Sequence, residues 1–331
     1  MRFWFRLRGG SGDGRWWGAL RWGCCGATNY CFHRSMSRLD LPIRAAKETA
    51  ERYGVATDRC EILQDGNTLV LRLSESLVAR VVTDRDGPRQ GGGWFARENA
   101  VAEHLARAGA PVIPLHPGLQ PGPHERHGYT MSFWQFVQVV AGNADPGEVG
   151  RTLRRCHEEL RGFAGPLEPL AILRESLGVL ERTGGEGAFG EDGAALLRRT
   201  LDKALGKLSA VPGQPLHGDA HYGNLMLTAE GVLWTDWEDT FAGPVEWDVA
   251  SIIWNARILN GDEETAGGIV SGYERAGGRV DGEVLRVCLA ARAAVMSAWY
   301  PVLYPRPDAE RQMKLRRRLE WLRSVEVEEA G

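Results

Sequence analysis

The sequence of 331 residues lacks several features that mark particular classes of protein. Its apolar runs fall well short of the roughly 20 residues that a membrane-spanning helix needs, which argues against a membrane protein. Its formal net charge is −3, so it has no basic excess that would point to nucleic acid as a partner. The cysteines form no C-x-x-C pair, and a reduced, cytoplasmic chain is the simplest interpretation.

Residues 1–35 differ from the rest, because they are rich in Arg, Gly and Trp and follow neither a helical nor a strand period. Arg6, Arg8 and a Gly-rich run interrupt any apolar segment that could serve as a secretory signal. A mitochondrial presequence is an alternative, since acids are scarce there, although serine is scarce too. We expect a disordered tail or, as the preferred hypothesis, a true start of translation at Met36, which peptides from residues 1–35 would contradict.

Hydrophobic patterning predicts strands first and helices later. After a helix at 41–53, the period of the apolar residues predicts strands at 60–64, 68–73, 77–83, 112–115 and 129–134, and a helix at 94–108. Beyond Pro146 it predicts helices at 148–160, 171–182, 194–208, 247–259, 283–302 and 309–325, and short strands at 225–227 and 232–235. We therefore expect an α+β fold with a small β-rich lobe with one long helix (36–134), a larger helical lobe (135–331) and a cleft between them.

The strongest chemical signal lies between His217 and Asp236. Phosphoryl transfer from ATP needs a carboxylate to orient and deprotonate the acceptor hydroxyl, oxygen ligands for Mg²⁺ and a cation on the phosphates. Asp219 is a candidate base, and Asn224 and Asp236 are candidate Mg²⁺ ligands joined by a predicted hairpin. No Lys or Arg lies between His217 and Arg257, whereas seven acids do, and such an anionic segment suits both Mg²⁺ and a cationic acceptor.

The pattern His217-Gly-Asp219-x-x-x-x-Asn224, followed by Asp236 and by Gly-Pro-x-x-x-Asp248-x-Ala, resembles the signature of the aminoglycoside phosphotransferase and choline kinase group. The resemblance runs from about residue 60 to residue 254 and implies a protein-kinase-like, two-lobed fold. It implies an ATP- and Mg²⁺-dependent transfer of the γ-phosphate to a hydroxyl of a small molecule, such as an aminoglycoside-like compound, a sugar or an amino alcohol. It makes Asp219 the catalytic residue, Asn224 and Asp236 the metal ligands, and Asp248 a structural support of the catalytic loop.

The same resemblance assigns nucleotide contacts to the first lobe. Arg80, on the third strand, would hold the phosphates in partnership with Glu98, although a Lys is usual at this position. Arg is a permanent cation that binds phosphate with a fork of donors. A phosphate-covering turn without G-x-G-x-x-G and a hinge that binds adenine complete the expected site, and their residues are Gly66, Asn67, Ser132, Phe133 and Trp134.

Other functions compete with this one. A protein kinase would carry H-R-D and D-F-G segments, which this sequence lacks. A nucleotide-binding pseudokinase or regulatory protein is the main alternative, because Arg80 departs from the pattern. A metal hydrolase could use His217, Asp219 and His221 as an H-x-D-x-H cluster, but we expect His217 to hold the loop by hydrogen bonds. For the kinase we expect a small-molecule acceptor, no nucleic acid or membrane partner, and a monomer or weak dimer.

Overall fold

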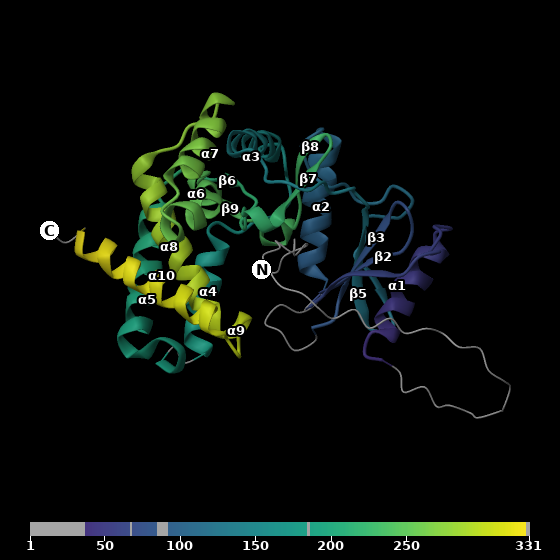
Figure 1. The fold of residues 1–331 in the computed structure, drawn as a ribbon, viewed down its shortest axis with the longest axis horizontal. Helices are drawn as coiled ribbons and strands as arrows, with labels where there is room; N and C mark the ends of the chain where they lie inside the picture. The colour runs from purple at the N-terminus through teal and green to yellow at the C-terminus, as the bar shows by residue number, and fades with distance from the viewer. Residues whose placement is uncertain (1–36, 67, 85–91, 184–185, 329–331) are drawn as a thin grey trace, which may run out of the picture.

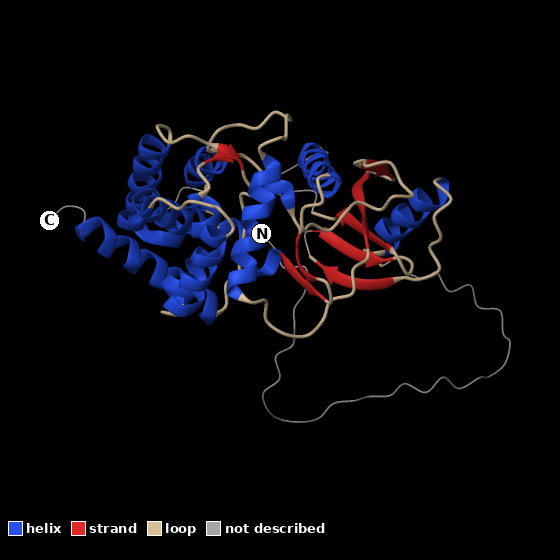
Figure 2. Cartoon of the chain, turned by 90° about the horizontal axis from the view of Figure 1, so that it is seen from above, coloured by secondary structure: helices blue, strands red, loops and turns tan. Residues whose placement is uncertain are grey.

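The computed structural model describes residues 37–66, 68–84, 92–183 and 186–328. The tail at 1–35, Asn67 and most of the Gly-rich loop at 87–93 lie outside these described residues. A lobe built around a sheet and a lobe built of helices lie side by side, as Figure 1 and Figure 2 show from two directions. This arrangement confirms the predicted α+β, two-lobed fold. Within the described residues, no helix has both the length and the apolar character that a membrane crossing demands.

The first lobe contains a five-stranded antiparallel sheet in the order β1-β2-β3-β5-β4. The strands are β1 (Glu61–Asp65), β2 (Thr68–Arg72), β3 (Leu77–Val82), β4 (His124–Arg126) and β5 (Tyr129–Gln135). Helix α1 (Asp40–Arg52) packs its buried alanines against the face that carries Leu77, Ala79 and Val81. Because side chains alternate along a strand, Val78 and Arg80 lie on the opposite face, toward α2 (Gly93–Arg107). The strand period therefore brings Arg80 beside α2.

The strand predicted at 112–115 is wrong. Val112 and Leu115 make only isolated bridges, to Trp234 and to Trp134, and β4 forms further along the chain instead. The two prolines at 111 and 114 have no backbone N–H and so cannot donate to a ladder. Their carbonyl groups do take part, because Pro111 accepts from Trp234 and Pro114 accepts from Gln135. The segment thus links the two lobes without being a strand.

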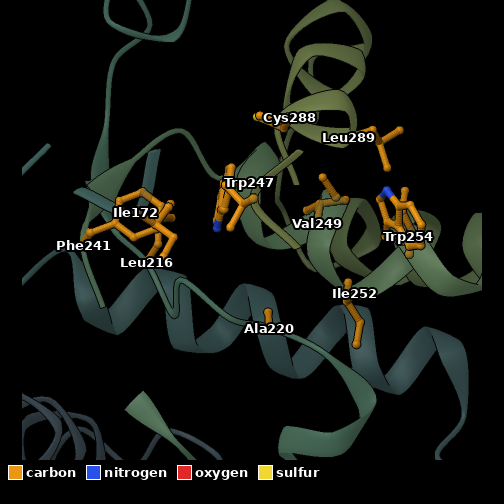
Figure 3. Close-up of a cluster of buried hydrophobic side chains, with 14 of the residues drawn as sticks. Ile172, Leu216, Ala220, Phe241, Trp247, Val249, Ile252, Trp254, Cys288 and Leu289 are labelled. Carbon is orange, nitrogen blue, oxygen red and sulfur yellow. The ribbon is translucent and has the colours of Figure 1, made fainter. Parts of the chain in front are cut away.

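The second lobe is mostly helical. Its helices are α3 (Pro146–Leu160), α4 (Ala171–Arg182), α5 (Glu186–Leu208), α6 (Glu246–Trp254), α7 (Glu263–Arg275), α8 (Gly282–Ala298), α9 (Tyr300–Leu303) and α10 (Ala309–Glu328). Two short strand pairs, β6 (Gln214–Pro215) with β9 (Ala242–Gly243) and β7 (Leu225–Thr228) with β8 (Gly231–Trp234), interrupt the helices. Figure 3 shows Trp247 and Trp254 of α6 together with Cys288 and Leu289 of α8 in the buried core of this lobe. Every residue of α6 is buried, and packing around the helix fixes its position next to the segment that carries His217 and Asp219.

Helix α7 was not predicted, and glycine explains why. Gly267, Gly268 and Gly272 each lower helix propensity, so the segment carries a weak helical signal. In the fold, α7 crosses α3 so closely that a Cβ at Gly272 would lie 2.1 Å from the carbonyl oxygen of Gly147. A Cβ at Gly150 of α3 would lie 1.9 Å from the carbonyl oxygen of Ile269. Tertiary packing that only glycine permits therefore outweighs the poor local propensity.

Candidate active site

A fully buried carboxylate, Asp248 of α6, supports the loop that carries Asp219. Its Oδ2 accepts a hydrogen bond from the backbone N–H of His217 at 2.7 Å, and its Oδ1 accepts one from Gly218 at 2.9 Å. His157 Nε2 lies 2.9 Å from Oδ2. Charge-assisted bonds of this kind are the strong ones in a dry interior. The structural role predicted for Asp248 is confirmed.

Gly218 allows the loop to turn at that point. Its φ is +85°, and a Cβ there would lie 2.0 Å from the carbonyl oxygen of Asp239. Its own carbonyl accepts from Trp247 Nε1 at 2.8 Å. His217 also holds the loop, because its Nε2 donates to the Thr235 carbonyl at 3.0 Å while its Nδ1 accepts from the Asp219 N–H at 3.3 Å. Burial lowers the pKa of His217, so the imidazole is neutral and holds this tautomer.

Asp219 lies at the end of this loop and is almost fully buried. Arg292 of α8 donates to its Oδ1, and His221 Nε2 lies 3.2 Å from its Oδ2. Burial opposes the charge, but the Arg292 guanidinium and His221 hold the pKa of Asp219 well below its usual value. The carboxylate is therefore ionised at neutral pH, with each oxygen oriented by a donor.

Asn224 and Asp236 meet beside this loop. Asn224 Nδ2 donates to the Asp219 carbonyl at 3.0 Å, and the Asn224 carbonyl accepts from the N–H of Thr235, next to Asp236. Asp236 has a left-handed backbone, with φ +67°, which is strained for a residue with a side chain. Asn224 Oδ1 and Asp236 Oδ1 are buried, and within the described residues neither accepts a hydrogen bond, while Asp236 Oδ1 forms an ion pair with Arg80. Hard oxygen atoms left in this way are the ligands that Mg²⁺ prefers.

Arg80 joins the two lobes at this point. Its Nη1 donates to both oxygens of Glu98, at 2.6 and 2.7 Å, so the predicted partnership is present. Its Nη2 donates to Glu238 Oε2 at 2.7 Å and lies 3.1 Å from Asp236 Oδ1. Arg97 of α2 adds a second link between the lobes, because its Nε donates to the Glu238 carbonyl at 3.1 Å.

The charges around Arg80 do not balance. Burial raises the pKa of Asp236 to about 6, against the Arg80 guanidinium, and the Glu238 carboxylate adds to the rise. Burial likewise raises the pKa of Glu98 to about 8, against the same guanidinium. Within the described residues, Glu98, Asp236 and Glu238 all form ion pairs with Arg80, and such a gathering of carboxylates favours the binding of another cation.

The remaining predicted nucleotide contacts are placed as follows. The carbonyl of Gly66 accepts from Thr83 Oγ1 at 2.9 Å, while Asn67 lies outside the described residues. Ser132, Phe133 and Trp134 lie inside β5 with buried side chains, and this part of β5 pairs with β3 on one edge and meets residues 114–116 on the other. The adenine contact assigned to these three residues stays a prediction.

Two charged residues of the site were missed in the sequence. Arg292 lies 73 residues beyond Asp219, yet a lone Arg within the apolar run from Leu289 to Ala298 was a usable signal, because a buried Arg needs a partner. Glu238, one of the seven acids between His217 and Arg257, has no assigned role in the sequence, and in the structure it binds Arg80. No sequence signal marks this role for an acid that follows a strand.

The cluster H-x-D-x-H does not form a metal centre in the described residues. His217 is occupied by backbone groups, and within the described ranges no set of three or more His, Cys, Asp and Glu side chains is arranged to hold a metal ion. A Mg²⁺ ion usually keeps one or two protein carboxylates and takes its other oxygen ligands from phosphates and water. The donor set of Asn224 and Asp236 therefore fits magnesium held together with a nucleotide.

Comparisons with known proteins identify a related family and related folds. Residues 54–284, more than half of the chain, match the model of the phosphotransferase enzyme family APH. No curated protein sequence matches the chain. Among solved structures, the chain resembles amicoumacin kinase hAmiN in complex with AMP-PNP, Ca²⁺ and Ami, with a TM-score of 0.64 and 12% identity over 85% of this chain and 94% of that one.

Two further structures share the fold. Spectinomycin phosphotransferase APH(9)-Ia, in complex with ADP and spectinomycin, has a TM-score of 0.61 and 15% identity over 86% of this chain and 99% of that one. Choline kinase LicA from Streptococcus pneumoniae has a TM-score of 0.61 and 15% identity over 84% of this chain and 98% of that one. These likenesses confirm the protein-kinase-like fold. With the family match, they also confirm the predicted class of enzyme, a small-molecule kinase, and the chain belongs to the phosphotransferase enzyme family.

Proposed function

We propose that this enzyme transfers the γ-phosphate of ATP, in the presence of Mg²⁺, to a hydroxyl group of a small molecule. The observation that carries the proposal is the meeting of three chemical parts at one place. An ionised carboxylate (Asp219), two buried oxygen donors (Asn224 and Asp236) and a cation fixed by a carboxylate (Arg80 with Glu98) are the parts that phosphoryl transfer requires.

Each residue has a distinct part in this reaction. Asp219 orients the acceptor hydroxyl and receives its proton, and Arg292 and His221 keep that carboxylate in one orientation. Glu98 fixes the Arg80 guanidinium on the side that faces α2, so that Nη2 is directed toward Asp236. Asn224 and Asp236 would hold Mg²⁺, which would supply positive charge to offset that of the phosphates.

The solved neighbours support the nucleotide and the divalent ion. The amicoumacin kinase was solved with AMP-PNP and Ca²⁺, and the spectinomycin phosphotransferase with ADP. We also propose that residues 36–134 bind the nucleotide and that residues 135–331 carry the catalytic and acceptor groups. The cytoplasmic location and the monomer or weak dimer stay predictions.

Asp219→Asn tests the mechanism. We expect the variant to bind Mg²⁺·ATP in calorimetry with an affinity close to that of the wild type, whereas kcat for ADP release falls by about 10²-fold or more, as when a general base is removed. The assay uses a panel of hydroxyl acceptors that includes aminoglycosides, sugars, choline and amino alcohols. Asn is chosen over Ala because its amide keeps the volume beside Arg292.

An Asp262→Asn variant serves as the control. Asp262 is an exposed helix cap, and Asn caps a helix about as well as Asp does. A wild-type chain that binds Mg²⁺·ATP but releases ADP with none of the acceptors would favour the pseudokinase. Normal turnover by Asp219→Asn would refute the assigned base.

A further inference from the structure

Among the described residues, two arginines are buried in the helical lobe, and one of them, Arg292, has an acidic partner. Arg292 of α8 is 2% exposed and binds Asp219, whereas Arg318 of α10 is 7% exposed. Among the described residues, no Asp or Glu forms an ion pair with Arg318, and its Nε makes no hydrogen bond. A buried charge without a counter-charge is costly, so such residues are rare unless a function needs them.

The neighbours of Arg318 are aromatic. Its guanidinium lies over the ring of Trp254, 5.4 Å from the ring centroid, which gives partial cation–π compensation. Tyr300 and Tyr304 are the other titratable neighbours besides Arg292. The Tyr300 hydroxyl is buried and has no hydrogen-bond partner within the described residues. Two donors, Arg318 Nε and Tyr300 Oη, are therefore present in this cluster without an acceptor.

This cluster, formed by Trp254, Tyr300 and Arg318, lies on helices that pack against α8, which carries the Asp219 partner Arg292. Helix α8 packs against both α6 and α10, and Figure 1 shows the three helices together in the helical lobe. The Arg292 guanidinium that binds Asp219 is near enough to Arg318 for its charge to act there. Burial first, and then the Arg292 cation, lower the pKa of Arg318 to about 10, so it remains charged at neutral pH.

Among the described residues, Arg318 adds a buried positive charge for which no ion pair is present. Asp219 and Arg292 neutralise one another, which leaves the Arg318 charge uncompensated. Four acids of the segment after His217 are engaged elsewhere: Asp236 and Glu238 lie at Arg80, Asp248 binds the catalytic loop, and Glu246 accepts from the N–H of Asp281.

We propose that the acceptor molecule carries an anionic oxygen group, a carboxylate or a phosphate, and that Arg318 and Tyr300 bind this group while the acceptor hydroxyl lies at Asp219. The proposal rests on the function proposed above and adds the chemical class of the substrate. A guanidinium fork and a phenol hydroxyl together match the oxygens of such a group. It departs from the cationic acceptor that the acidic sequence segment favours.

The test measures thermal stability with simple anions and no nucleotide. Sodium acetate and inorganic phosphate are compared with sodium chloride at equal ionic strength and pH. We expect at least one of the two anions to raise the Tm of the wild type by about 2 °C or more at a concentration well above its Kd. Acetate alone would indicate a carboxylate acceptor, and phosphate alone a phosphorylated one.

Three variants decide the role of Arg318. Arg318→Met removes the charge and keeps the volume, and we expect it to lose the anion-dependent rise in Tm. We also expect its Tm without anions to equal or exceed that of the wild type, because an unpaired buried charge is removed. Tyr300→Phe removes one hydroxyl and should weaken the rise. Arg316→Met, at an exposed position of the same helix, should keep it.

The outcomes separate this proposal from the kinase assignment. A wild-type chain that gains stability with Mg²⁺·ATP, but equally from acetate, phosphate and chloride, retains the proposed function and refutes the anionic acceptor. An Arg318→Met variant that keeps the anion effect refutes it too, as does an efficient acceptor without an anionic group. In ADP-release assays with these small compounds as acceptors, we expect faster ADP release with L-serine than with ethanolamine. We likewise expect faster release with D-glycerate or glycerol 3-phosphate than with glycerol.

Discussion

Asp248→Asn replaces one oxygen by an NH₂ group and should weaken the hydrogen bonds that hold the catalytic loop. The two carboxylate oxygens accept from the N–H groups of His217 and Gly218 and contact His157 Nε2. An amide has one acceptor oxygen, so its NH₂ must face at least one of these donors. The less costly orientation places the NH₂ against Gly218 and keeps the oxygen at the other two.

The expected cost follows from that geometry. One charge-assisted hydrogen bond is lost, which is about 1.5–3 kcal/mol, and one buried N–H remains unsatisfied, which is about 1–3 kcal/mol. The free energy of unfolding should therefore fall by about 3–5 kcal/mol, and Tm by roughly 10 °C. We expect kcat to fall by about 10²-fold as well, because the loop no longer holds Asp219 in position.

Urea denaturation followed by tryptophan fluorescence, together with ADP-release kinetics, would measure both effects. Asp262→Asn is again the matched change, at an exposed cap, and should cost no more than about 0.5 kcal/mol. A loss below about 1 kcal/mol for Asp248→Asn, with normal kcat, would show that the loop does not depend on this carboxylate.

Two other predictions test the packing and the charges. Arg80→Met leaves Glu98 buried without a counter-charge and should lower the free energy of unfolding, measured by denaturant titration, by about 3–5 kcal/mol. Arg80→Lys keeps a cation beside Glu98 and should lower it clearly less. Equal losses for the two variants would contradict the pairing. Gly150→Ala places a methyl group against the Ile269 carbonyl and should lower the free energy of unfolding by more than about 3 kcal/mol. Gly267 has open space around it, so Gly267→Ala should instead stabilise α7 by about 0.5–1 kcal/mol. Similar effects of the two changes would refute the close crossing of α3 and α7.

Short motifs made part of the site predictable, because they carry the resemblance to the kinase family. That resemblance implied the support role of Asp248 and the pairing of Arg80 with Glu98, and both contacts are present in the structure. The period of two along β3 also placed Arg80 on one face of the sheet. Such features need only the residues of one or two neighbouring elements.

The missing parts depend on distant packing. Arg292 reaches Asp219 only because α8 packs against α6, and no local pattern encodes that approach. Helix α7 forms in spite of its glycines because it packs closely against α3, and that close packing leaves no room for a side chain at Gly272. Glu238 binds Arg80 across 158 residues of sequence. Each of these features is determined by which surfaces meet, and a single sequence does not state that directly.

The position of Arg80 has a consequence for the order of ligand binding. Its Nη2 is shared by Asp236 and Glu238, so these carboxylates compete with phosphate oxygens for the same donor. A divalent ion held by Asp236 would remove one of these two competing carboxylates from the guanidinium. Metal and nucleotide should therefore each strengthen the binding of the other, and free ATP without a divalent ion should be a weak ligand of this enzyme.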